Sequence, residues 1–145
     1  MSKSNGTENS LLLLLFNATT FANVAINATS SPLTNLYVAL HTADPGETGT
    51  QSTSECAYGS YARVAVARTS GGWTVTNNTV NPAATITFPE ATSGSETATY
   101  FSVGADVSGA GRIFYRGQIT TPGGGIVITT TVIPELTTAT AITED

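Results

Sequence analysis

The stretch NLYVALHTADPGETGTQSTSECAYGSYARVAVAR, residues 35–68, decides the fold that we predict for this chain. It begins and ends with strand-like segments, residues 36–41 and 61–68, in which apolar side chains recur at strand spacing. A polar loop, residues 42–60, joins them and contains an Asp-Pro-Gly turn sequence at 44–46. Because the stretch also holds the only histidine and the only cysteine of the chain, any catalytic centre is expected here.

The composition favours strands and argues against nucleic acid. The chain has 145 residues and a net charge of −5, and only 10% of its residues are charged, against about a quarter in typical soluble domains. Threonine is abundant, and its branched side chain suits a pleated sheet. The five basic residues are dispersed, whereas a phosphate backbone requires clustered Lys and Arg. We therefore expect no nucleic-acid partner.

The N-terminal segment predicts a short arm and one helix. Residues 1–9 are polar and are predicted to form a flexible arm. Residues 10–26 carry apolar side chains at helical spacing, after two residues of N-cap type. The apolar run is too short to span a bilayer and lacks a basic flank, so we expect no membrane partner. Its apolar face is expected either to cover the sheet of its own subunit or to dock on a neighbour.

From about residue 34 to 143 the pattern is typical of short strands separated by Gly, Pro and Asn. It predicts an all-β fold, an antiparallel β-sandwich or jelly roll of about eight strands, within a single domain of residues 10–145. No strand is followed by a helical pattern, so a doubly wound parallel sheet is not expected. The predicted strands are residues 36–41, 61–68, 73–76, 84–88, 98–103, 112–119, 126–133 and 138–143.

His41 and three nearby acids, Asp44, Glu47 and Glu55, could form a metal or acid–base site. A metal needs ligands that converge from rigid elements, whereas these acids lie in a glycine-broken loop. We therefore interpret Asp44 as the start of a turn and expect His41 to cap the loop by bonding a backbone carbonyl. A loop of this length is expected to reach a partner.

Other catalytic motifs are absent from the sequence. Cys56 stands alone, so it is expected either as an unpaired thiol or in an intermolecular disulfide. No Gly-x-Ser-x-Gly elbow accompanies the serines, and the glycine-rich segments lack the phosphate-binding lysine and the dinucleotide fingerprint. We predict that the chain is not an enzyme and binds no cofactor or metal.

The sequence leaves two interpretations open for the segment around Phe114, and two for Trp73. Arg112, Phe114 and Arg116 have even spacing, which places them on one side of a strand, either as a cation–π contact patch or as a solvated face. Trp73 is expected in the core or in an interface.

Several segments together resemble a family of small tailed-phage virion proteins, often labelled tail-fibre proteins. The residues that carry the resemblance are 36–46, 61–68, 72–75, 86–89 and 143–145. The size and β-rich composition also resemble capsid cement, or decoration, proteins. The resemblance implies a protein that is made in the host cytoplasm and located in the virion, on the capsid surface, with no catalytic residues.

Our leading functional hypothesis is a capsid decoration protein. It would bind the outer surface of the major capsid shell and bridge capsomers to stabilise the head. Its predicted partners are the major capsid protein and itself, as a homodimer or homotrimer. The alternative is a tail-associated fibre or adhesin protein that binds the host surface, and a small hydrolase using His41 ranks third.

Residues from the helix, the polar loop and the late strand are predicted to contact a partner. They are Leu11, Leu12, Leu15, Phe16, Phe21, Asp44, Pro45, Glu47, Glu55, Arg112, Phe114 and Arg116.

Overall fold

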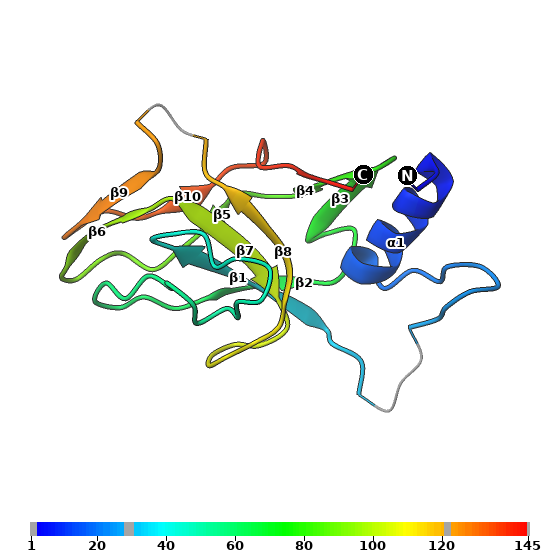
Figure 1. Ribbon diagram of the computed structural model, residues 1–145, viewed down its shortest axis with the longest axis horizontal. Coiled ribbons are helices and arrows are strands. Elements are labelled where there is room, and N and C mark those ends of the chain that lie inside the picture. The colour runs from blue at the N-terminus through cyan, green and yellow to red at the C-terminus, as the bar shows by residue number, and fades with distance from the viewer. Residues whose placement is uncertain (1–2, 28–30, 121–122, 145) are drawn as a thin grey trace. The chain divides into compact units, whose positions relative to one another are not determined.

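The computed structural model describes residues 3–27, 31–120 and 123–144 (Figure 1). The chain divides into two compact units, each assembled from segments far apart in the sequence. The predicted single domain of residues 10–145 stays a prediction. Unit 1 is formed by Met1–Asn35, Val66–Ile86 and Leu136–Asp145, and unit 2 by Leu36–Ala65 and Thr87–Glu135.

The helix α1 (Asn5–Asn17), in unit 1, begins and ends earlier than the predicted helix of residues 10–26. Its N-cap is Ser4, whose side chain accepts a hydrogen bond from the backbone N–H of Thr7 at 3.4 Å, so that polar residues predicted as a flexible arm are helical. The helix ends because Ala18 adopts the left-handed conformation, with φ 53°. The apolar spacing alone could not reveal either boundary.

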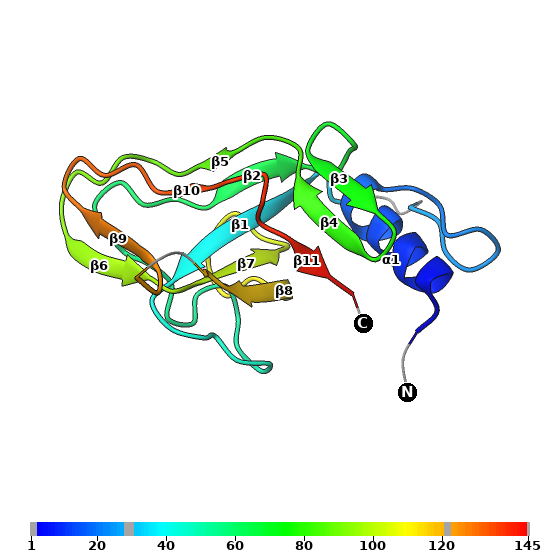
Figure 2. The same ribbon diagram turned by 90° about the horizontal axis from the view of Figure 1, so that it is seen from above.

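The apolar face of α1 packs on strands of its own unit. Leu12 and Phe16 have no exposed surface, and the Phe16 ring meets the Trp73 ring edge to face at a centroid distance of 4.9 Å. Trp73 begins β3 (Trp73–Thr76) and is 1% exposed. Figures 1 and 2 show α1 alongside β3 and its neighbour β4 (Thr79–Pro82). The helix therefore covers its own sheet, and Trp73 belongs to the core.

Unit 1 contains a three-stranded antiparallel sheet with the order β11-β4-β3. Strands β3 and β4 form a hairpin in which Thr76 faces Thr79. The two residues between them, Asn77 and Asn78, make the turn, and Asn77 has a φ of 54°. Strand β11 (Ile142–Thr143) pairs with the outer edge of β4.

The side chain of Arg68 caps the C-terminal end of α1. Its guanidinium donates hydrogen bonds to the backbone carbonyls of Leu14 at 2.8 Å, Leu15 at 2.7 Å and Leu33 at 2.7 Å. The last carbonyls of a helix have no partner within the helix and carry a partial negative charge. Since α1 has no basic residue in its last turn, Arg68 supplies the missing donors and charge.

The central sheet has the order β2-β1-β7-β8. Its strands are β2 (Val64–Ala67), β1 (Asn35–His41), β7 (Tyr100–Gly104) and β8 (Ile113–Gln118). Val38, Ala39 and Leu40 are fully buried, which explains why β1 reads as a continuous apolar run instead of an alternating one. Strand β8 forms an edge of this sheet.

Two-stranded sheets account for the remaining strands. Strand β6 (Ser95–Ala98) pairs antiparallel with β9 (Ile126–Thr129). Strand β5 (Ile86–Thr87) pairs with β10 (Glu135–Leu136).

The predicted fold class is confirmed. In the described part of the chain, a single helix precedes eleven strands, and the structure is all-β and sandwich-like with antiparallel pairing. The strands outnumber the predicted eight because β4 and β10 lie outside the predicted strands, and because the predicted strand of residues 98–103 corresponds to β7, with β6 as a separate strand before it. Strand β10 is only two residues long and therefore produces no periodic pattern. Within the described residues, no helix is both long and apolar enough to cross a membrane.

Replacing Arg68 with methionine is expected to lower the free energy of unfolding by about 2 kcal/mol, because partly buried helix carbonyls lose charged donors. Arg68→Lys should fall between Arg68→Met and the unchanged protein, since one ammonium cannot reach the same carbonyls. Urea denaturation followed by circular dichroism at 222 nm measures both effects. Arg112→Met, at an exposed arginine, is the control. An unchanged midpoint for Arg68→Met would contradict the capping role.

Candidate functional site

The polar loop of residues 42–60 is fastened to strand β1 by backbone hydrogen bonds. The N–H of Thr42 donates to the carbonyl of Ser54 at 2.8 Å, and the N–H of Cys56 donates to the carbonyl of Leu40 at 2.9 Å. The loop therefore leaves β1 and returns to the same strand. Its contact with a partner stays a prediction, but its two ends belong to the body of unit 2.

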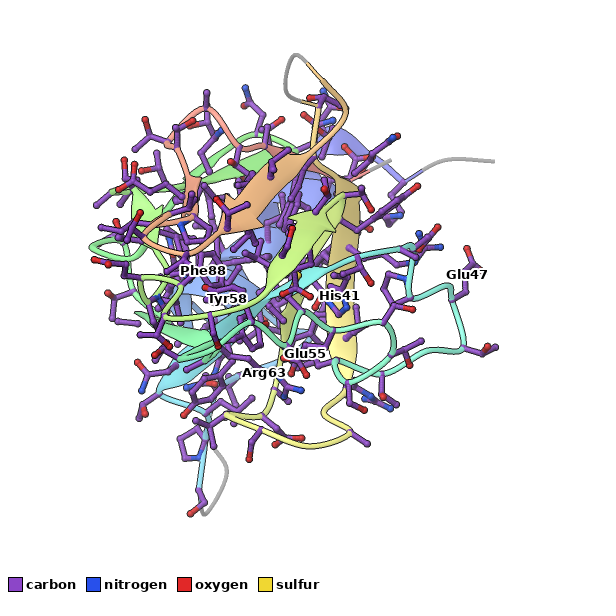
Figure 3. All side chains as sticks on the ribbon, turned by 90° about the vertical axis from the view of Figure 1, so that its left-hand side faces the viewer. His41, Glu47, Glu55, Tyr58, Arg63 and Phe88 are labelled. Carbon is purple, nitrogen blue, oxygen red and sulfur yellow. The ribbon has the colours of Figure 1, made fainter. Side chains whose placement is uncertain are left out.

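Glu55, in this loop, forms an ion pair with Arg63, whose side chain is buried (Figure 3). Arg63 Nε donates to one carboxylate oxygen of Glu55 at 2.7 Å and Nη2 donates to the other at 2.8 Å. The arginine side chain is 2% exposed and the glutamate 17%. The guanidinium also donates to the carbonyls of Asp106 at 2.8 Å and Gly109 at 2.6 Å. One side chain thus joins the polar loop to the β7–β8 connection.

Gln51, also fully buried, ties the same segments together. Its side-chain amide donates to the carbonyl of Tyr37 at 2.9 Å, and its side-chain oxygen accepts the N–H of Asp106 at 3.2 Å. A Cβ added at Gly104 or Gly111 would overlap the Gln51 side chain. These two positions therefore require glycine because glutamine occupies the adjoining space.

His41 caps the loop as the sequence predicts. Its Nδ1 lies 2.8 Å from the carbonyl oxygen of Thr53 and its Nε2 lies 2.8 Å from Ser102 Oγ. Because a carbonyl oxygen can only accept, Nδ1 carries the proton and Nε2 accepts the hydroxyl of Ser102. Burial lowers the pKa of His41 below its usual value, which favours the neutral ring.

The contact between Ser102 and His41 has the residue types and distance of a nucleophile and its general base. Both residues, however, have no exposed surface. A substrate cannot approach the serine oxygen in this structure. The pair therefore serves as a buried polar link between β1 and β7, which are neighbours in the sheet.

Two of the acids proposed to form a site with His41, Glu55 and Asp44, bind other groups. Both carboxylate oxygens of Glu55 bind Arg63. Asp44 accepts the backbone N–H of Gly46 at 2.9 Å, which confirms the predicted turn. Across residues 3–27, 31–120 and 123–144, no group of three or more His, Cys, Asp or Glu side chains is placed to hold a metal ion.

Cys56 is an unpaired, buried thiol, 3% exposed. Burial raises its pKa to about 12, with a further contribution from the nearby charge of Glu96. Glu96 is held in place by the backbone N–H groups of Ala57 and Tyr58, each at 2.9 Å. The thiol is therefore protonated at neutral pH, and reactivity requires the thiolate.

An open pocket of about 400 Å³ lies between the tip of the polar loop and strand β8. Arg116 on β8 forms an ion pair with Asp44 of the loop at 3.0 Å, and the side chain of Glu47 is 92% exposed. Figure 3 shows Glu47 projecting outward at the loop tip, away from Arg63 and Glu55. The pocket is lined by Gly46, Glu47, Gly49, Ile113, Phe114, Tyr115 and Arg116.

The structure corrects the predicted alignment of Arg112, Phe114 and Arg116. The register of β7 and β8 shifts, since Val103 faces Tyr115 whereas Gly104 faces Ile113, which leaves Phe114 as an extra, bulged residue. A bulge interrupts the alternation of side chains, so even spacing no longer places residues on one side. Phe114 and Arg116 both line the pocket, and Arg112 precedes β8 and does not.

Other predicted contact residues are distributed over both units. Leu12, Phe16 and Pro45 are buried within the chain and offer no surface to a partner, and Glu55 is engaged by Arg63. The remaining ones are half-buried or exposed: Leu11, Leu15, Phe21 and Arg112.

Sequence reasoning missed the residues that organise the site: Gln51, Tyr61, Arg63 and Ser102. A usable signal was the arginine within the apolar strand sequence YARVAVAR, because a charge in such a strand needs a buried partner. No sequence pattern predicts the role of Tyr61. Its hydroxyl donates a hydrogen bond to Glu55 at 3.0 Å and accepts one from the N–H of Leu40 at 3.0 Å.

A family model described as podophage GP4 fiber I protein gp80 matches residues 2–135. The chain belongs to this family. The match confirms the resemblance to small tailed-phage virion proteins, and it identifies a bacteriophage structural protein of the virion. No curated protein matches the chain.

In this gp80-family protein, replacing Arg63 with methionine is expected to lower the free energy of unfolding by about 3–5 kcal/mol. The substitution leaves the partly buried Glu55 carboxylate without its cationic partner. Arg112→Met, at an exposed arginine, should change the stability by less than about 0.5 kcal/mol. Guanidinium denaturation of both variants measures the difference. Equal stabilities would show that the ion pair does not hold the loop.

The stability is expected to decrease as the pH falls from 7 to 5.5. The unfolded chain binds a proton at His41 near pH 6.5, whereas the folded chain resists it because burial lowers the pKa. Stability is thus complete above the unfolded pKa and declines below it. Thermal unfolding midpoints across this range measure the effect. Since the chain has one histidine, His41→Asn should abolish the slope, and a slope that persists in the variant would refute the assignment.

Proposed function

We propose that this chain is a subunit of a tail-associated fibre of a podophage, with a structural and binding role. The observation that carries the proposal is the gp80 family match, which extends over residues 2–135 and so covers nearly the whole chain. The family description names a fibre, and it therefore favours our alternative hypothesis over capsid decoration.

The internal chemistry of unit 2 supports a role without catalysis. Its reactive side chains are engaged in holding the polar loop: His41 with Thr53 and Ser102, and Glu55 with Arg63. The thiol of Cys56 is buried and protonated. Such groups stabilise a rigid surface, which is what a protein that acts by contact requires.

The proposed partners are other copies of the chain and the host surface. Fibres present many copies of a subunit, so a modest affinity at each site becomes strong attachment through multivalency. The low content of charged residues, 10%, suits this role because polar but uncharged groups can enter contacts without a large desolvation cost.

Electron microscopy of intact particles labelled with a gold-conjugated antibody against the chain tests the proposal. We expect the label on the tail, and we expect quantitative mass spectrometry to recover the chain with separated tails. A label spread over the head, with a copy number that matches the capsomers, would overturn the fibre proposal and support capsid decoration.

A further inference from the structure

We propose that the pocket between the tip of the polar loop and strand β8 binds a neutral saccharide. The inference rests on the proposed fibre function, since the saccharide would belong to the host surface. It assigns a ligand class to residues that no comparison singles out.

The bulge at Phe114 is what builds this pocket. In a regular strand, successive side chains point to opposite faces, so a pocket on one face receives alternate residues. Here four consecutive residues, 113–116, line the same pocket, because the register of β7 and β8 shifts at this point. Bulges of this kind re-aim side chains and are over-represented beside functional sites.

The charged groups of the pocket suit a hydroxyl ligand. Asp44 holds the Nη1 of Arg116 at 3.0 Å and 3.2 Å. The Nη2 of Arg116 lies 3.9 Å from a carboxylate oxygen of Glu47, which is beyond hydrogen-bond distance. A hydroxyl group placed there can accept a hydrogen bond from the guanidinium and donate one to the carboxylate. Neighbouring hydroxyls of a sugar ring match such paired donors and acceptors.

The charge balance selects a neutral ligand over an anionic one. Glu47 and Arg116 line the pocket, and a second carboxylate, Asp44, lies beside it as the ion-pair partner of Arg116. The local charge is therefore negative, as is that of the whole chain, −5. A phosphate, a sialic acid or a uronic acid would meet an arginine that is already neutralised and a second carboxylate that repels it.

The apolar part of the pocket suits the face of a sugar ring. Phe114 is partly exposed where it lines the pocket, and the C–H groups of a pyranose can pack on an aromatic ring. On the loop side of the pocket, Gly46 has a positive φ of 74°, and a Cβ added there would meet no atom within 4 Å. The wall of the pocket is thus low on this side.

The same residues argue for binding without hydrolysis. Glycoside hydrolysis uses two carboxyl groups that flank the scissile bond, one of which donates a proton. Here Asp44 lies beside the pocket and is paired with Arg116, and Glu47 is 92% exposed. The two carboxyl groups therefore do not form an enclosed pair that could flank a scissile bond.

An oligosaccharide array tests the inference with the full-length purified protein. The array carries neutral hexose and N-acetylhexosamine oligosaccharides of two to four units, together with versions that bear sialic or uronic acids. We expect binding to neutral members and not to their acidic counterparts. Isothermal titration with the strongest neutral member then gives the affinity.

Two variants address the pocket directly. Glu47→Ala removes an exposed carboxylate and should weaken binding about tenfold or more, since a charged hydrogen bond is lost. Phe114→Ala should weaken it to a similar extent by removing the stacking surface. Glu90→Ala, which removes an exposed carboxylate outside the pocket, is the matched control and should bind normally. Circular dichroism verifies that each variant is folded.

The inference is overturned if no array member binds, if acidic members are preferred, or if Glu47→Ala binds as well as Glu90→Ala. These outcomes are distinguishable from failure of the fibre proposal. A tail label without saccharide binding refutes the inference alone. A head label combined with neutral saccharide binding refutes the fibre role, whereas the ligand assignment of the pocket stands.

Discussion

The guanidinium of Arg63 is the constraint on which unit 2 depends. It binds the carboxylate of Glu55 with two hydrogen bonds and reaches the carbonyls of Asp106 and Gly109. These partners come from two loops that strands alone would not hold together. The Arg63 side chain is 2% exposed. If one of its partners is removed, the guanidinium loses a hydrogen bond that water cannot readily replace. The loops are therefore held in one arrangement.

Unit 1 uses a buried arginine in a related way. Arg68 donates to carbonyls of α1 and to that of Leu33, and it thereby fixes the end of the helix to the segment before β1. A planar guanidinium has five donors in a rigid fork, so one residue can satisfy several carbonyls at once. In a chain with five basic residues, two of them, Arg63 and Arg68, are buried and organise the backbone.

The hydrogen bonds that hold the polar loop also determine which part of it is exposed. The ends of the polar loop are fastened to β1, whereas its tip, around Glu47, projects from the body of the unit (Figure 3). The bulged strand β8 faces that tip across the pocket. A rigid frame with exposed side chains on a short loop segment is a common arrangement for recognition. It agrees with the membership of the chain in a family of phage fibre proteins.

By itself, the sequence determined the all-β class, the turn that begins at Asp44, and the loop-capping role of His41, because turn residues and apolar runs act over a few neighbouring positions. It also revealed the phage family. The tertiary structure alone decided the start of α1 and the bulge at Phe114. It also decided which polar residues are buried, since two of the partners of Arg63, the carbonyls of Asp106 and Gly109, lie more than forty residues away. Such pairings depend on how distant segments meet, and no local pattern encodes them.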